Sequence, residues 1–156
     1  MIIIQALASL ALRVALALPF WQAGLTRWEG FLRIRPDTVA FYADTYRPVL
    51  FGTTHAIPYA DTAAVILGSA EILLPAALVI GFATRLSALG LLIMTGIVFA
   101  ANFSGIPFPG YDAAVPGPDF WQTTTLPWGA MALALIAYGA GLFSFDRLIW
   151  ESVRGR

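Results

Sequence analysis

The sequence lacks cysteine and lysine, and it contains a single histidine, His55. Without cysteine the chain can supply no disulfide exchange, thiolate nucleophile, iron–sulfur ligand or cysteine-based zinc site. One histidine cannot ligate a haem from both sides. We therefore expect no metal site in this chain, and any redox cofactor would be a diffusible lipid-soluble molecule or would belong to a partner.

Charge is also scarce, at 12% of the 156 residues, and nine basic residues balance nine acidic ones. A net charge of zero gives no electrostatic footprint for nucleic acid, so we expect no such partner. Hydrophobic residues reach 59%, well above the proportion in an ordinary soluble domain. A soluble protein of this size could not bury so much apolar surface, whereas lipid is itself an apolar solvent. The composition therefore predicts a single membrane domain over residues 1–156.

Four apolar stretches are each close to the length of about 20 residues that crosses hydrocarbon. They comprise residues 3–25, 63–82, 86–103 and 126–143. The sequence thus predicts an all-α membrane protein, a bundle of four transmembrane helices. Only Ala83, Thr84 and Arg85 separate the second and third stretches, so these two should form an antiparallel hairpin. The first stretch is not expected to be a signal peptide, because it lacks a basic N-terminal region and contains Arg13.

Two longer connections, residues 26–62 and 104–125, fall on the same side of this bundle and are expected to cap one mouth of it. In the first connection Asp37 follows Pro36, which favours a helix start, and we expect a short amphipathic helix in the membrane interface. The second is rich in proline and glycine and should be irregular. Several aromatic side chains of the first connection are expected at headgroup depth, namely Trp28, Phe31, Phe41, Tyr42 and Tyr46.

The arginines do not decide the orientation of the chain, because the two sides of the bundle carry equal numbers. The basic, amphipathic tail at residues 146–156 favours cytoplasmic termini. The loop side has Arg27, Arg33, Arg35 and Arg47, and the terminal side has Arg85, Arg147, Arg154 and Arg156.

Arg13 and Glu71 lie inside long apolar runs, where an unpaired charge costs about 2.5–3.5 kcal/mol or more. Counted from the terminal side, Arg13 is ten residues in from Ile3 and Glu71 is ten residues in from Gly81, which is about 15 Å at 1.5 Å per residue. Antiparallel helices would bring them level, so we predict that they form a buried ion pair or share a hydrogen-bond network in the bundle core. Either the pair only fixes helix register, or Glu71 is a proton-carrying carboxylate, tuned by Arg13, that serves a polar headgroup such as a quinone carbonyl.

Other polar positions are weaker candidates. Arg85 and Asp146 lie at the terminal-side ends of the second and fourth stretches and are expected to form a structural clamp. Four further residues are candidates for ligand binding, although membrane anchoring, packing or a solvated loop position would also account for them. They are Arg27, Trp28, His55 and Asn102.

These positions together resemble the DoxX family of small four-helix membrane proteins, over the chain from about Arg13 to Leu148. Residue 27 is more usually lysine in that family, so Arg27 keeps the charge. The stretch from Trp28-Glu29-Gly30-Phe31 to Thr84-Arg85 is most similar to members encoded beside multinuclear iron-dependent oxidases that modify metal-binding peptides. The resemblance is carried by Arg13 with Gly24-Leu25-Thr26-Arg27-Trp28, by Ala70-Glu71-Ile72 with Gly81-Phe82-Ala83-Thr84-Arg85, and by Gly139-Ala140-Gly141 with Ser144-Phe145-Asp146.

The resemblance implies a bacterial inner-membrane location and association with redox proteins, since the founding members look like small subunits of a thiosulfate:quinone oxidoreductase. Three functions stay open. The first is an oxidoreductase subunit that binds quinone and works with a cofactor-bearing redox partner. The second is a non-catalytic scaffold or assembly subunit. The third is a small transporter or permease, which would need to form a homo-oligomer because four spans show no inverted repeats.

Overall fold

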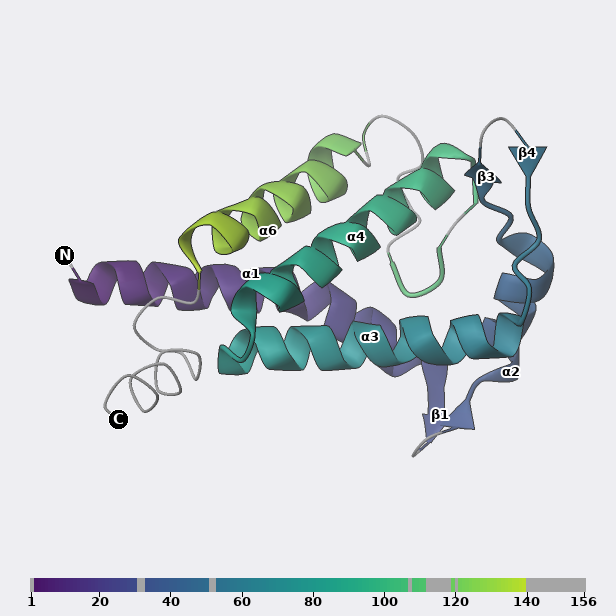
Figure 1. The fold of residues 1–156 in the computed structure, drawn as a ribbon, viewed down its shortest axis with the longest axis horizontal. Helices are drawn as coiled ribbons and strands as arrows, with labels where there is room; N and C mark the ends of the chain where they lie inside the picture. The colour runs from purple at the N-terminus through teal and green to yellow at the C-terminus, as the bar shows by residue number, and fades with distance from the viewer. Residues whose placement is uncertain are drawn as a thin grey trace, which may run out of the picture.

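The computed structural model describes residues 2–30, 33–50, 53–106, 108–111, 119 and 121–139, and its long helices form one elongated bundle (Figure 1). Helix α1 spans Ile2–Arg27, α3 spans Ala60–Ile80, α4 spans Thr84–Phe103 and α6 spans Leu126–Tyr138. Each of them contacts two neighbours, in the cyclic order α1, α3, α4, α6. The prediction of an all-α bundle of four helices is confirmed.

Three of these helices are long and apolar enough to cross a membrane, judged by length and composition: Ile4–Arg27, Ala60–Ile80 and Thr84–Phe103. The fourth, α6, has 13 residues and directly follows a π-helical turn, η2, at Trp121–Thr125. Residues 140–143 of the predicted stretch lie outside the described residues. Gly139 adopts φ 73° and ψ −163°, outside the helical region, so α6 ends at Tyr138.

The turn between α3 and α4 follows from a glycine at the end of α3. Gly81 lies in the left-handed region at φ 78°, and its N–H donates to the carbonyl oxygen of Ala77 at 3.0 Å. This is a common way for a helix to end, because glycine has no Cβ to clash in that conformation. Three residues later Thr84 begins α4, so the predicted antiparallel hairpin is confirmed.

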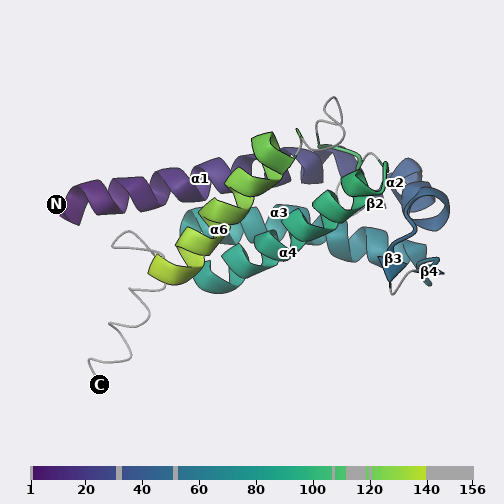
Figure 2. The ribbon, with the colours of Figure 1, turned by 90° about the horizontal axis from the view of Figure 1, so that it is seen from above.

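Helices α1 and α3 are antiparallel and staggered along the bundle. The first turns of α1 extend beyond the α3–α4 turn, and the first turns of α3 extend beyond the end of α1 (Figures 1 and 2). Gly24 packs on the backbone of Glu71, where an added Cβ would lie 3.0 Å from the carbonyl oxygen. Pro75, four residues later in α3, has no N–H to donate to that carbonyl.

Short elements build the cap at the loop end of the bundle. The predicted helix in the first connection begins at Pro36, as α2 (Pro36–Ala40), and continues as a π-helical turn, η1 (Phe41–Thr45). Two small antiparallel hairpins were not predicted: β1 (Trp28–Gly30) with β2 (Arg33–Ile34), and β3 (Val49–Leu50) with β4 (Thr53–Thr54). Strands of two or three residues are too short to show an alternating pattern in the sequence.

The bundle interior combines small, aliphatic and aromatic side chains, and further large apolar side chains are exposed on its outside. Ala23, Ala64, Ala88 and Ala132 are buried between the helices and allow close helix contact. An apolar exterior is what a lipid solvent requires. Exposed large apolar residues include Ile4, Leu7, Ile66, Leu73, Leu86, Ile93 and Leu133.

Candidate functional site

Glu71 is the centre of a buried polar site between α1 and α3. It lies in the middle of α3 and is 0% exposed, and its carboxylate forms an ion pair with Arg27, the last residue of α1, which is 1% exposed. Arg27 Nε donates to Glu71 Oε2, and Arg27 Nη2 donates to Oε1 at 2.8 Å. Two parallel hydrogen bonds of this kind are the strong, oriented form of arginine–carboxylate pairing.

The second loop is tied to both members of this pair. The Tyr111 hydroxyl donates to Glu71 Oε1 at 2.9 Å, and Arg27 Nη2 donates to the carbonyl oxygen of Pro109 at 3.0 Å. Arg27 and Pro109 are 82 positions apart in the sequence, and Glu71 and Tyr111 are 40 positions apart. The site therefore fixes three segments to one another: the end of α1, the middle of α3 and the loop after α4.

Glycine makes two of these close approaches sterically feasible. A Cβ at Gly24 would lie 2.8 Å from Ile72 Cγ1, so a larger residue would push α1 away from α3. Gly110 has φ 84°, and a Cβ there would lie 3.0 Å from the Cα of Ala23. The loop can therefore rest on the α1 backbone only with glycine at position 110, and this contact brings Tyr111 to Glu71.

Five aromatic residues, which we call the aromatic cap, cover the ion pair: Phe41, Tyr42, Tyr46, Phe108 and Tyr111. Phe108 is at the centre, with its ring 5.3 to 6.1 Å from the rings of the other four. The Arg27 guanidinium carbon lies 5.0 Å from the centroid of the Phe108 ring, within cation–π range. Both predicted loops thus contribute to a cap on one side of the bundle, as expected.

The aromatic residues of the first connection were predicted to lie at headgroup depth, and three of them, Phe41, Tyr42 and Tyr46, belong to the interior of the cap. All three are buried within the protein and pack on Phe108. The physical reason is that the loop after α4 supplies an apolar surface for them. Phe31 lies outside the described residues.

Two buried donors in this site have no hydrogen-bond partner within the part of the chain that the structure describes. They are Nη1 of Arg27 and the hydroxyl of Tyr42, whose side chain is 0% exposed. Burial raises the pKa of the Tyr42 and Tyr111 phenols well above the usual value, and the nearby Glu71 carboxylate raises both further. Both phenols therefore keep their protons at neutral pH. The site offers hydrogen-bond donors to a group with acceptor oxygens.

The predicted ion pair between Arg13 and Glu71 is wrong, because the arginine that pairs with Glu71 is Arg27. Arg13 is also fully buried, and its Nη2 donates to Ser9 Oγ at 3.3 Å. Gly24 marks the level of Glu71 on α1, and Arg13 lies eleven residues earlier, about 16 Å along the helix axis. The stagger of the two helices puts Arg13 level with the α3–α4 turn instead.

The other predicted positions are dispersed over the structure. Trp28 lies beside the site: its Nε1 donates to the carbonyl oxygen of Gly68 at 3.3 Å. His55 is exposed, and its Nε2 is 2.8 Å from Thr53 Oγ1, away from the ion pair. Asn102 is half-buried on the last turn of α4.

The predicted clamp between Arg85 and Asp146 falls partly outside the described residues, which do not include Asp146. Arg85 lies next to the end of α6, with its Nε 3.4 Å from where a Cβ on Gly139 would be. Among the residues that the structure describes, no group of three or more histidine or acidic side chains is placed to hold a metal ion.

Phe108 and Tyr111 are the site residues that sequence reasoning missed. Their segment was noted as rich in proline, glycine and aromatics, but nothing in it indicates a contact with Glu71, 40 residues earlier. The one available clue is that Glu71, a buried acid, needs donors, and a tyrosine in a loop on the same side of the bundle can supply one.

A bundle of long apolar helices with an arginine–glutamate pair buried under an aromatic cap defines a multi-pass helical membrane protein. Comparison with protein families matches residues 8–103 to DoxX. Because this range is more than half of the 156 residues, the chain belongs to the DoxX family, whose members are often associated with redox systems. The matched range includes Arg13, Arg27 and Glu71. No curated protein and no solved structure matches the chain.

Proposed function

We propose that this protein is the membrane subunit of a redox system and that it holds the polar head of a quinone at the Arg27–Glu71 site. The observation behind the proposal is the pair of buried donors, Arg27 Nη1 and the Tyr42 hydroxyl, that lack partners among the described residues. A buried donor left unsatisfied costs about 1–3 kcal/mol. A quinone carbonyl is an acceptor that fits both, and its ring suits an aromatic surround.

Glu71 is the proton-carrying group in this proposal. When a quinol is oxidised, its two electrons pass to the oxidised cofactor of a redox partner, one of its two hydroxyl protons passes to a Glu71 oxygen, and the other is released to water. In the reverse direction two electrons arrive at the quinone, Glu71 returns one proton to one quinone oxygen, and water supplies the second proton to the other. The chain itself contributes binding, orientation and proton transfer, and the partner carries the electrons.

An apolar groove supports a lipid-soluble ligand at this site. It follows the α1–α3 contact and has a volume of about 360 Å³. One end is formed by Pro75, one helical turn from Glu71, so a chain attached to a head at Glu71 can enter it. Its lining is almost wholly apolar, as an isoprenoid tail requires. The lining residues are Val14, Ala17, Leu18, Trp21, Pro75, Ala76, Val79 and Ile80.

The setting that we propose is the bacterial inner membrane, with cytoplasmic termini and the capped end toward a redox partner in the periplasm. The family resemblance supports the membrane and the kind of partner, and the basic tail supports the orientation. The similarity to members encoded beside multinuclear iron-dependent oxidases makes such an oxidase the partner class to test first.

One observation favours a different function, a non-catalytic scaffold. Both Glu71 oxygens are already engaged, Oε2 by Arg27 and Oε1 by Arg27 and Tyr111. A carboxylate so fully bonded is suited to holding three segments in register, as buried ion pairs do in some proteins. In a scaffold the Tyr42 hydroxyl would be only a destabilising buried group.

Tyr42→Phe separates the two functions, with Tyr46→Phe as a matched control on the same turn of the cap. The proteins are purified in mild detergent, and bound quinone is extracted and quantified by chromatography. We expect quinone with the native chain and with Tyr46→Phe, and a clear loss with Tyr42→Phe. If no quinone co-purifies, or if Tyr42→Phe retains it and is more stable, the scaffold is correct.

A further inference from the structure

A second groove lies at the capped end of α4, formed by side chains that take no part in the Arg27–Glu71 pair. It has a volume of about 300 Å³. Along α4 it runs from Ile93 to Ser104, about 16 Å at the helical rise. Its other wall comes from the first connection, just after η1. The α4 residues that line it include Ile93, Gly96, Ile97 and Ala100, and the opposite wall has Tyr46, Arg47 and Pro48.

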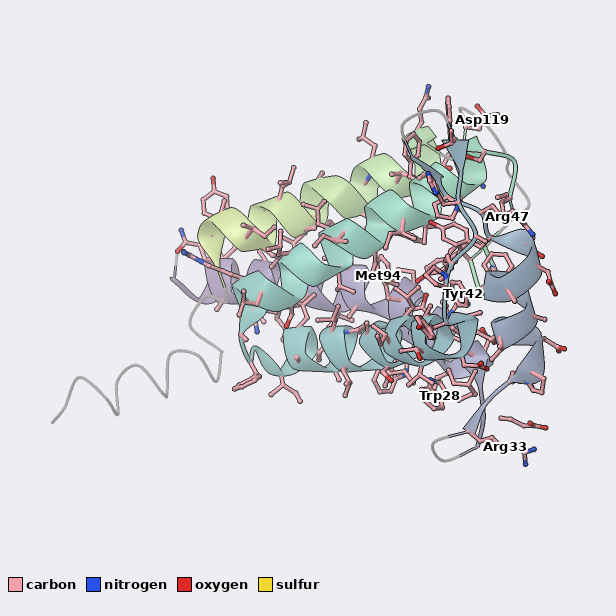
Figure 3. All side chains as sticks on the ribbon, turned by 45° about the vertical axis from the view of Figure 1, so that its right-hand side comes forward. Trp28, Arg33, Tyr42, Arg47, Met94 and Asp119 are labelled. Atoms are coloured by element: carbon pink, nitrogen blue, oxygen red, sulfur yellow. The ribbon has the colours of Figure 1, made fainter. Side chains whose placement is uncertain are left out.

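The groove has a polar end and an apolar end. At the polar end Arg47 is exposed and forms no ion pair with any described residue, since the described pairs are Arg27–Glu71 and Arg33–Glu29. Figure 3 shows Arg47 at the capped end of the bundle. The hydroxyl of Tyr46 forms no hydrogen bond within the described ranges, and burial raises the pKa of this phenol, so it remains a donor at neutral pH.

The apolar end is open because of a glycine. A Cβ at Gly96 would meet no atom within 4 Å, so the wall of the groove is hollow at this point. Ile93, one turn deeper, is exposed on the same helix. A flexible hydrocarbon chain can therefore lie along α4 from the capped end toward the middle of the membrane.

We infer that this groove binds one anionic phospholipid of the membrane, with its phosphate at Arg47 and Tyr46 and an acyl chain along α4 over Gly96. A guanidinium and a phenol at the end of a membrane-crossing helix match a phosphate in charge and in hydrogen bonding. The length of apolar surface beneath them matches the chain attached to that phosphate. Neither a free phosphate nor a plain hydrocarbon would use both ends of the groove.

The test is native mass spectrometry of the purified full chain with added palmitoyl-oleoyl phosphatidylglycerol. We expect one retained lipid per native chain. Loss of the Arg47 charge should weaken retention about fivefold, the effect of one basic residue on an anionic lipid. Inorganic phosphate, which lacks the chain, should not be retained at the same concentration. A native chain that retains phosphate as well as the lipid would limit the site to the headgroup and overturn the acyl-chain assignment.

Two matched pairs of variants make the result specific. Arg47→Gln is compared with Arg35→Gln, an exposed arginine outside the groove, and Gly96→Leu with Gly129→Leu, which lies on the neighbouring α4–α6 surface. Lipid retention should fall in the first member of each pair only. Equal retention by Arg47→Gln and Arg35→Gln overturns the proposal, and this pair decides alone if Gly96→Leu does not fold. Quinone content should be unchanged by Arg47→Gln, so the two proposals can fail separately.

Discussion

Arg13 and Arg27 are two fully buried arginines on the same helix, and only one of them reaches the buried acid. Both are at most 1% exposed. Arg27 lies under the aromatic cap and forms a two-point pair with Glu71, whereas Arg13 lies near the opposite end of the bundle and contacts Ser9. The difference arises from the stagger of α1 against α3. Which charges meet in a membrane bundle is decided by this offset, and depth counted from the helix ends is a poor guide to it.

The position of Arg27 on its helix adds a second difference. It is the last residue of α1, where the carbonyl groups of the final turn carry partial negative charge. A cation is favoured there, and the loops are close enough to add Phe108, Pro109 and Tyr111 around it. Arg13 lies in the middle of α1, away from both the C-terminal end of the helix and the aromatic cap. The capped end of the bundle is therefore where a polar ligand can be accommodated.

The strongest test of this comparison is a pair of double-mutant cycles on the free energy of unfolding in detergent. Arg27→Met or Glu71→Leu alone should each cost about 3–5 kcal/mol, because each leaves a buried charge without its partner. The double variant should cost much less than their sum. The cycle of Arg13→Met with Glu71→Leu should be additive within about 0.5 kcal/mol, since the residues are on different levels. Equal coupling in both cycles would contradict the stagger.

The contribution of the loop can be isolated with Tyr111→Phe, which removes one hydroxyl and keeps the ring. The lost hydrogen bond is donated to a charged carboxylate, so we expect destabilisation by about 1.5–3 kcal/mol. Tyr59→Phe is the matched control, because Tyr59 is 82% exposed and should change little. Denaturant titration followed by circular dichroism gives both values. A loss in the control as large as in Tyr111→Phe would mean that the contact to Glu71 is not the cause.

Two glycines should respond to alanine with opposite signs. Gly24→Ala places a methyl 2.8 Å from Ile72 Cγ1 and 3.0 Å from the Glu71 backbone, so we expect a cost of about 1–3 kcal/mol from overpacking. Gly96→Ala meets nothing within 4 Å and should stabilise α4 by up to about 1 kcal/mol through helix propensity. Thermal unfolding of both variants measures the difference. A Gly24→Ala variant as stable as the native chain, or more stable, would show that α1 and α3 are not in close contact at Gly24.

The sequence is sufficient to predict the helices, because lipid solvation imposes long apolar runs that stand out from the loops. The beginnings of α1 and α4 and the start of α2 at Pro36 were close to their predicted positions for this reason. The change of backbone conformation at Gly139 leaves no mark on composition, because the residues after it remain apolar.

The site was predictable only in part. An acid inside an apolar run must have a partner, and this argument correctly singled out Glu71. Equal depth in the sequence pointed to Arg13 and not to Arg27 as its partner, because the true pairing depends on how far α1 slides along α3, which Gly24 and Ile72 fix by contact. The two loop contacts could not be predicted either: the Tyr111 hydroxyl donates to Glu71, and the Pro109 carbonyl oxygen accepts from Arg27. Contacts between residues 40 or more positions apart depend on how the loop folds.

The smallest expected effect concerns the second ion pair, between Arg33 and Glu29 on the β1–β2 hairpin. Their side chains are 79% and 55% exposed, and the nearest charged atoms are 3.9 Å apart. Water screens such a pair, so Glu29→Gln should change the free energy of unfolding by less than about 0.5 kcal/mol, and added salt should erase even that. Glu71→Gln should keep its full effect in 1 M salt, since a buried pair is little screened. If salt weakened both pairs alike, Glu71 would have to be accessible to water, and the argument for a dry site under the aromatic cap would fail.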